Sequence, residues 1–246
     1  PNVGIVEVPD SRLMVLADLQ KPEKVLPATV EFVDIAGLVA GASKGEGLGN
    51  QFLANIRETD AIAHVVRCFE DENVVHVAGK IDPLDDIETI NTELALADLT
   101  AVERHLAKSV KLARAGGDKE AARLVAVLEK CQAALNEARP IRALDLYDEE
   151  RVILKPLCLI TAKPTMYVAN VREGGFDNNP HLDAVLAHAA REKAPVVAVC
   201  AAIEAEIGDM SDEDKAVFLE DMGMHEPGLN RVISAVSAGG KPRDDR

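Results

Sequence analysis

Several residue types and sequence features are scarce in this 246-residue chain, and each shortage narrows the class of protein. Tryptophan is absent and aromatic residues make up only 3%, whereas 48% of the residues are hydrophobic, so the sequence predicts an aliphatic core. No run of 18 apolar residues and no signal peptide is found, which favours a soluble, cytoplasmic protein with no membrane partner. The net charge of −15 argues against a surface that binds nucleic acid mainly through its phosphates.

Cysteine is also sparse, and its spacing excludes common cysteine-based frameworks. The four cysteines (Cys68, Cys131, Cys158 and Cys200) are far apart, and none forms a C-x-x-C pair. Each lies among aliphatic neighbours. The pattern predicts buried, reduced thiols rather than disulfides or a zinc site.

Five short apolar runs rich in β-branched residues are separated by helical patterns. The runs cover residues 3–8, 29–35, 61–69, 165–171 and 195–202, and the helical patterns cover 11–19, 50–59, 180–192 and 211–222. Buried strands that alternate with helices are typical of a parallel sheet in an α/β protein. We therefore expect an α/β fold with a parallel sheet flanked by helices.

The segment between the third and fourth runs has a different character. Apolar residues recur at helical spacing from Leu99 to Ala113, and Gly116-Gly117 interrupts the pattern. A heptad seam follows, at Ala121, Leu124, Leu128, Cys131, Leu135 and Ala138. The pattern predicts a helical hairpin, inserted as a coiled-coil arm; the alternative is an amphipathic helix pair packed against the sheet. The expected domains are a sheet domain of residues 1–84 and 161–233, a helical insertion of residues 85–160, and a tail of residues 234–246.

A glycine-rich stretch, DIAGLVAGASKGEGLGN (34–50), lies between an apolar strand and a helical run. The order strand, D-x-x-G, glycine-rich loop and helix is typical of the metal-binding and γ-phosphate-sensing part of P-loop NTPases. In that arrangement the aspartate holds Mg²⁺, and the glycine N–H donates to the γ-phosphate. D-x-x-G alone occurs by chance in many proteins, so its context decides.

That context resembles one family. DIAGLVAGASKGEGLGNQFLANIRETDAI resembles the switch II region of the YchF/Obg-like ATPases, a branch of the P-loop NTPases. The similarity continues through HVVRCFEDENVVHVAGKIDPLDDIETINTELALADL, KPTMYVANVRE and VCAAIEAEI, and it covers almost the whole chain. The resemblance implies a G domain with an inserted helical arm, and it implies ATP and Mg²⁺ as cofactors.

The resemblance also implies roles for individual residues around the phosphates. Asp34 would bind Mg²⁺, and Gly37 would contact the γ-phosphate. Leu38 occupies the position where Ras-like GTPases have a water-orienting glutamine, and leucine cannot polarise water. The family candidate for water activation is a histidine that corresponds to His76, which becomes the expected catalytic residue.

A second set of residues would recognise the base. Typical GTPases carry N-K-x-D where this chain has Asn170, Val171, Arg172 and Glu173, so the guanine-binding carboxylate is displaced. This departure implies that ATP is preferred over GTP, with Asn170, Val171 and Glu173 at the base. The turn Cys200, Ala201 and Ala202 would line the base with its backbone.

One expected motif is missing from the 246 residues. The phosphate loop G-x-x-x-x-G-K-[ST] is absent, and residues 1–10 match the family just after switch I. The chain is therefore expected to lack the N-terminal phosphate-loop segment and the C-terminal TGS domain of the family. We expect this chain alone to bind ATP weakly and to have little ATPase activity.

Partners follow only from the resemblance, which implies the ribosome or the translation machinery. An RNA contact would need Lys108, Lys111 and Arg114 of the arm or another domain, and these residues also fit a solvated helix face. The alternative function is a non-catalytic, protein-binding regulatory module. A GTPase is disfavoured by Leu38 and Glu173.

Overall fold

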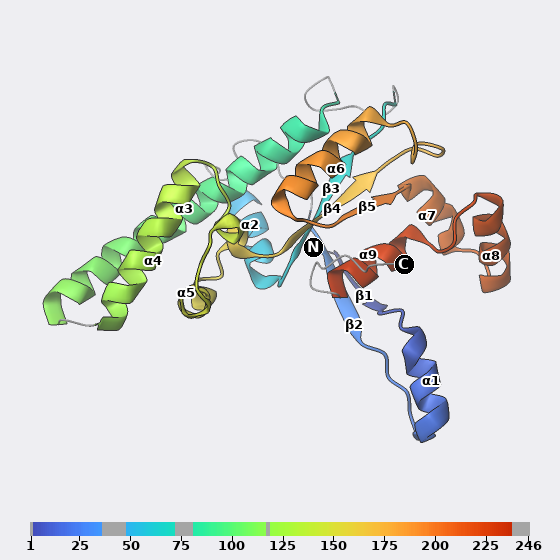
Figure 1. The fold of residues 1–246 in the computed structure, drawn as a ribbon, viewed down its shortest axis with the longest axis horizontal. Coiled ribbons are helices and arrows are strands. Elements are labelled where there is room, and N and C mark those ends of the chain that lie inside the picture. Colours follow the sequence, from blue (N-terminus) through green and yellow to red (C-terminus); the bar gives the residue numbers. More distant parts are fainter. Residues whose placement is uncertain (1, 36–47, 72–80, 117–118, 238–246) are drawn as a thin grey trace. The chain divides into compact units, whose positions relative to one another are not determined.

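The computed structural model describes residues 2–35, 48–71, 81–116 and 119–237 (Figure 1). The chain divides into two compact units. The sheet unit comprises residues Pro1–Asp34, Ala63–Leu84 and Thr165–Arg246, and the helical unit comprises Ile35–Ile62 and Asp85–Pro164. In the described part of the chain, no helix combines the length and apolar character needed to cross a membrane.

A three-stranded parallel sheet carries the core of the sheet unit. Its order is β3 (Ile62–Arg67), β4 (Thr165–Asn170) and β5 (Val196–Val199). β4 and β5 are parallel, with Tyr167 opposite Val196. β3 runs in the same direction as β4, because the Ile62 N–H donates to the Pro164 carbonyl at one end and the Cys68 N–H to the Asn170 carbonyl at the other. The predicted parallel sheet is confirmed for these three runs.

The first two runs form a different structure. β1 (Asn2–Glu7) and β2 (Thr29–Asp34) pair antiparallel as a separate two-stranded sheet, with Asn2 opposite Asp34. Val3 and Ile5 are 54% and 69% exposed, so the prediction that residues 3–8 and 29–35 are buried parallel strands is wrong. The chain reverses direction through α1 (Ser11–Gln20), which lies between the two strands. A short apolar run predicts that a strand forms but not the direction in which it pairs, which is why the prediction failed here.

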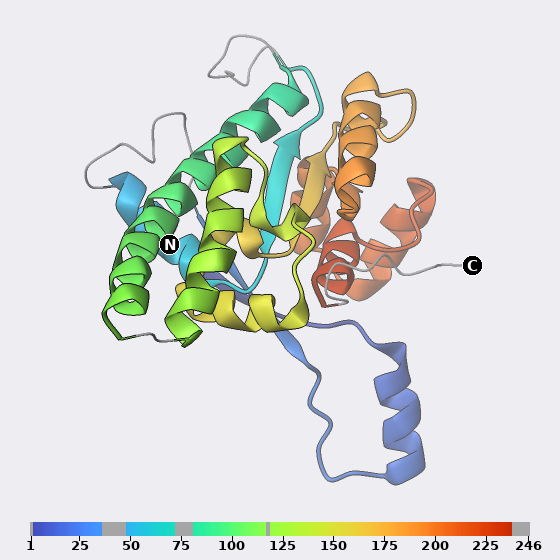
Figure 2. The same cartoon turned by 60° about the vertical axis from the view of Figure 1, so that its left-hand side comes forward.

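Besides α1, the described part of the sheet unit contains the helices drawn in orange to red in Figure 2: α6 (Pro180–Glu192), α7 (Ala201–Gly208), α8 (Asp212–Asp221) and α9 (Gly228–Ser237). Side chains of β4 and β5 pack with Val232 of α9 and Phe32 of β2. Ser211 caps α8 by accepting from the Asp214 N–H, as its SDED start predicts. β5 ends at Val199, so the predicted run of residues 195–202 extends three residues too far, into the start of α7.

The helical unit contains the predicted hairpin. Its helices are α2 (Leu48–Glu58), α3 (Pro83–Gly116), α4 (Lys119–Asn136) and α5 (Asp148–Leu154), with short 3₁₀ turns at Ile141–Ala143, Lys155–Leu157 and Ile160–Ala162. Val102 of α3 packs in one cluster with Leu128, Cys131 and Leu135 of α4. These three seam residues and Ala121 are buried as predicted, whereas Ala138 lies beyond the helix end at a positive φ of 56°.

The cysteines correct one further prediction. Cys68, Cys131 and Cys200 are buried thiols, but Cys158 is exposed. Cys158 ends a 3₁₀ turn in the left-handed region, with φ 47°, and this bend keeps its side chain outside the neighbouring core. Its aliphatic neighbours in sequence therefore do not surround it.

Candidate nucleotide site

The carboxyl ends of β4 and β5 bring predicted base-binding residues together. Asn170 is the last residue of β4, and Cys200 precedes the first turn of α7. The Asn170 Oδ1 accepts from the Ala201 N–H at 3.0 Å, so the side chain bridges the two strand ends. Among the described residues, this is the one hydrogen bond that the Asn170 side chain makes. The Nδ2 of the amide can therefore donate to a ligand. In open α/β sheets this edge is where ligands bind.

The other predicted base residues differ in what they can offer. Val171 and Cys200 are each 1% exposed, so their side chains belong to the core and only their backbone groups could reach a ligand. The Val171 N–H already donates to the Val199 carbonyl (2.8 Å). Ala201, Ala202 and Glu173 are exposed. The edge therefore presents one amide side chain, one carboxylate side chain and the start of a helix.

A residue that the sequence prediction missed holds the loop after β4 in place. The Asn179 Nδ2 donates to the carbonyls of Cys68 and Gly175, both at 2.9 Å. Its Oδ1 caps α6 by accepting from the N–H groups of His181 and Leu182. Asn179 thus joins the end of β3, the loop and α6. The dipeptide Asn179-Pro180 is a helix-start signal that could have revealed the cap, but nothing local indicates the bond to Cys68.

A tight turn shapes the same loop near Glu173. The Gly175 N–H donates to the Arg172 carbonyl at 2.9 Å, and Gly174 has a positive φ of 67°. A Cβ atom on Gly175 would lie 3.0 Å from that carbonyl oxygen, so a side chain at this position would crowd the turn. The turn therefore fixes the backbone position of Glu173.

The residues predicted around the phosphates are only partly described. Asp34 ends β2 and is exposed. Gly37, Leu38 and His76 lie outside the described residues. Among the described residues no group of three His, Cys, Asp or Glu side chains could hold a metal by itself. A single carboxylate still fits Mg²⁺ in a phosphate site, because that ion takes its remaining ligands from phosphate oxygens and water.

The chain is similar to several known proteins. A family profile described as "50S ribosome-binding GTPase" matches residues 12–103. The "Ribosome-binding ATPase YchF" of Haemophilus influenzae is 63% identical over 235 residues, which cover 96% of this chain and 64% of the relative. The protein of the same name from Bacillus subtilis is 49% identical over 238 residues, with 96% and 65% covered.

A solved structure supports the fold as well. It is described as the Schizosaccharomyces pombe YchF GTPase, and it matches with a TM-score of 0.82 and 32% identity. The match covers 97% of this chain and 65% of that structure. The chain thus spans just under two thirds of the length of these relatives. With a G-domain sheet and nearly end-to-end sequence similarity, the chain belongs to the YchF family.

Proposed function

We propose that this chain forms an ATP-binding and ATP-hydrolysing switch that associates with the ribosome in the cytoplasm. The observation that carries the proposal is the Asn170 side chain, which bridges β4 and α7 at the ligand-binding edge of the sheet. The names of the bacterial relatives, ribosome-binding ATPases, support the reaction and the partner. In this proposal residues 1–84 and 161–233 bind nucleotide and residues 85–160 form the partner-binding arm. Of the predicted tail, residues 234–246, the first four residues are the end of α9.

Base preference follows from the chemistry of two side chains, the half-buried Asn170 and the exposed Glu173. The Asn170 Nδ2 would donate to a purine ring nitrogen, which adenine and guanine share. The Glu173 carboxylate could accept from the exocyclic amine of adenine. Glutamate is one methylene longer than the aspartate of N-K-x-D and the lysine is replaced by Val171, so the pair of donors on guanine is no longer matched, and ATP is favoured over GTP. Val171 and the turn of Cys200, Ala201 and Ala202 would complete the base site through their backbones.

Hydrolysis would depend on three residues before and after β3. Asp34 would hold Mg²⁺, which neutralises charge on the phosphate oxygens when bound. The Gly37 N–H would donate to the γ-phosphate. His76 would orient the attacking water in its neutral form, since Leu38 carries no polar atom for this task.

The ribosomal contact is assigned to the helical arm. Lys108, Lys111 and Arg114 are exposed on α3, and their charges suit the phosphates of RNA. A cytoplasmic location follows from this partner. A domain that binds nucleotide and an arm that binds the ribosome would together form a switch. In proteins of this kind, contacts to the γ-phosphate are made in the ATP state and lost on hydrolysis.

Two proteins are needed to test the reaction. The first is the 246-residue chain, which contains no G-x-x-x-x-G-K-[ST] and is expected to bind ATP weakly. The second, called the extended chain below, has a YchF-type phosphate-loop segment added before Pro1. We expect calorimetry with Mg²⁺ to show clearly tighter ATP binding by the extended chain, and tighter binding of ATP than of GTP.

The catalytic assignment is tested by His76→Ala in the extended chain. Loss of a general base or water-orienting group is expected to lower ATP turnover by about 10²-fold or more, with ATP affinity nearly unchanged. His225→Ala is the control, because His225 is an exposed histidine in the turn before α9. Equal turnover in His76→Ala and in the parent would remove His76 from this role. An extended chain that binds ribosomes but hydrolyses no ATP would favour the non-catalytic binding module.

A further inference from the structure

The helix that follows the glycine-rich stretch belongs to the same compact unit as the arm. Residues Ile35–Ile62, which include α2, group with Asp85–Pro164 and not with the sheet. Leu53 and Ile56 of α2 pack with Leu94 of α3 and with Ile160. α2 is thus anchored on the base of the hairpin by an apolar contact.

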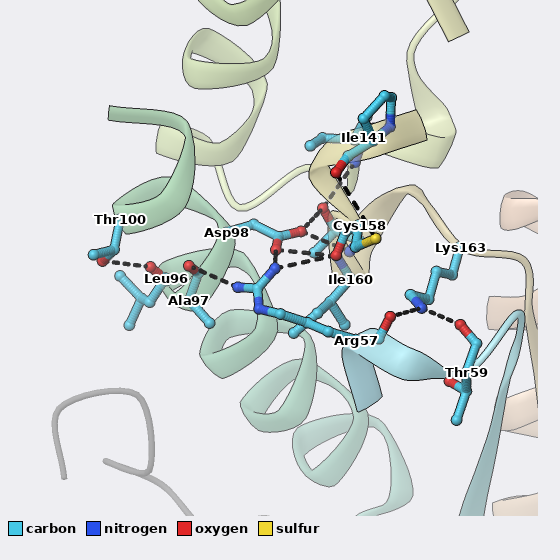
Figure 3. A network of polar contacts seen from close by, with 12 residues as sticks. Arg57, Thr59, Leu96, Ala97, Asp98, Thr100, Ile141, Cys158, Ile160 and Lys163 are labelled. Atoms are coloured by element: carbon cyan, nitrogen blue, oxygen red, sulfur yellow. Dashed lines mark hydrogen bonds and ion pairs between the residues drawn. The ribbon is translucent and has the colours of Figure 1, made fainter. Parts of the chain in front are cut away.

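Arg57, in the last turn of α2, adds a polar anchor (Figure 3). Its Nη1 donates to the Asp98 carboxylate of α3 at 3.2 Å and to the Cys158 carbonyl at 3.1 Å. Its Nη2 donates to the Ala97 carbonyl at 3.3 Å. One guanidinium group therefore binds both α3 and the segment that leads to β4.

Asp98 is the centre of this network. Its side chain is 0% exposed, and Oδ1 accepts from the Ile160 N–H at 3.0 Å. Oδ2 accepts from the Thr161 N–H at 2.7 Å and from the Thr161 hydroxyl at 2.8 Å. With Arg57, four hydrogen-bond donors surround one buried carboxylate. A buried charge held by this many directional bonds resists displacement.

Lys163 holds the end of α2 from the other side (Figure 3). Its Nζ donates to the carbonyl of Arg57, in the last turn of the helix, and to the carbonyl of Thr59, just after it. A lysine at a helix C-terminus satisfies carbonyls that have no partner within the helix. α2 is therefore fixed at its C-terminal end through one ion pair and one lysine.

We propose that Arg57, Asp98 and Lys163 are positioning residues that make α2 and the arm move as one body, so that ribosome affinity depends on the bound nucleotide. The inference rests on the proposed function, in which the loop before α2 contacts the γ-phosphate. A change that the nucleotide imposes on the start of α2 would then be passed through the network to α3. Since coupling between two binding sites is reciprocal, the ribosome must change ATP affinity by the same factor.

The test compares Arg57→Met with its parent in the extended chain. Methionine keeps the length and apolar stem of the side chain but removes every guanidinium hydrogen bond. Arg139→Met is the matched control, because Arg139 pairs with Glu137 in an exposed ion pair of the same unit. Affinity for bacterial ribosomes is measured by sedimentation with a non-hydrolysable ATP analogue and with ADP, and the ratio of the two affinities gives the coupling.

The parent and Arg139→Met are expected to show a coupling ratio of about 5-fold or more, the lower range for allosteric proteins. Arg57→Met is expected to bring the ratio close to one while ribosomes still bind with ADP. Hydrogen exchange of the α2 amides is the second measurement, and it should accelerate in Arg57→Met. Lys163→Met, which frees the same helix end without exposing Asp98, should act in the same direction.

The outcomes separate the two ideas. A parent that binds neither ATP nor ribosomes would overturn the proposed function. A parent that binds both, with a ratio near one, would overturn the coupling alone. A ratio that persists in Arg57→Met and Lys163→Met despite faster α2 exchange would also reject these residues as its source. If Arg57→Met does not fold, Lys163→Met decides by itself.

Discussion

At the scale of residues, the four cysteine thiols differ in exposure, and this difference governs their reactivity. Burial raises the pKa of Cys68 to about 11. Burial also raises the pKa of Cys131 to about 11, with a smaller contribution from the charges of Asp98 and Glu150. Cys158 is exposed at the end of a 3₁₀ turn. The thiolate is the reactive form of cysteine. Burial therefore lowers the reactivity of Cys68 and Cys131 twice, by blocking access and by raising the pKa of the thiol.

A thiol titration should therefore count one reactive cysteine in the native chain. At about pH 8, a thiol with a pKa near 11 is ionised in roughly one molecule in a thousand, and burial adds a steric barrier. We expect dithionitrobenzoate to modify Cys158 rapidly, with all four thiols reacting after denaturation. Cys158→Ser should abolish the fast phase. Rapid modification of two or more thiols in the native chain would contradict the burial of Cys68, Cys131 and Cys200.

Single residues also show where sequence reasoning stops. Asn170 could be predicted, because an asparagine at a strand end matches a known base-binding motif, and the structure places it at that edge. Asp98 could have been flagged as a polar residue in an apolar helical pattern. Its partner Arg57 is 41 positions away, and no local signal joins the two. Long-range polar pairs require the fold itself.

At the scale of elements, the ends of a helix can be predicted from the sequence, whereas the pairing of a strand cannot. α6 has the predicted bounds because Asn179, Pro180 and a left-handed Lys193 mark both of its ends. β1 and β2 were predicted as strands, but their antiparallel pairing and exposure were not. Helix ends are set by nearby hydrogen bonds, whereas strand direction is decided by the path of the whole chain.

The hairpin offers a test at this scale. Leu128 of α4 is 0% exposed and packs with Val102 and Cys131, so Leu128→Ala should lower the free energy of unfolding by about 2–5 kcal/mol. Leu112→Ala in α3 is the control, because Leu112 is 53% exposed. Urea denaturation followed by circular dichroism measures both. A loss below about 1 kcal/mol for Leu128→Ala would place this residue outside a packed core.

At the scale of the whole molecule, charge is distributed unevenly along the chain. The net charge is −15, yet residues 104–117 contain four basic residues and no acidic residue. Arg104, Lys108, Lys111 and Arg114 are exposed on α3. At a rise of about 1.5 Å per residue they span ~15 Å of one helix. Burial, with the charges of Arg104 and Lys108, lowers the pKa of His105, which is consistent with a positive local field.

This asymmetry predicts that the proposed ribosome binding depends on the basic segment and on salt, whereas the proposed ATP binding does not. In the extended chain, the triple variant Lys108→Glu, Lys111→Glu and Arg114→Glu should bind ribosomes about 10-fold or more weakly. Each phosphate contact contributes close to one unit to the slope of log affinity against log salt, so the slope should fall by about two to three. The matched control, Lys24→Glu, Lys155→Glu and Arg191→Glu, makes the same change in net charge at exposed positions elsewhere. The two variants have the same net charge, so a difference in ribosome affinity between them must come from local contacts of the α3 segment. Equal weakening by both variants would mean that total charge, and not this segment, governs binding.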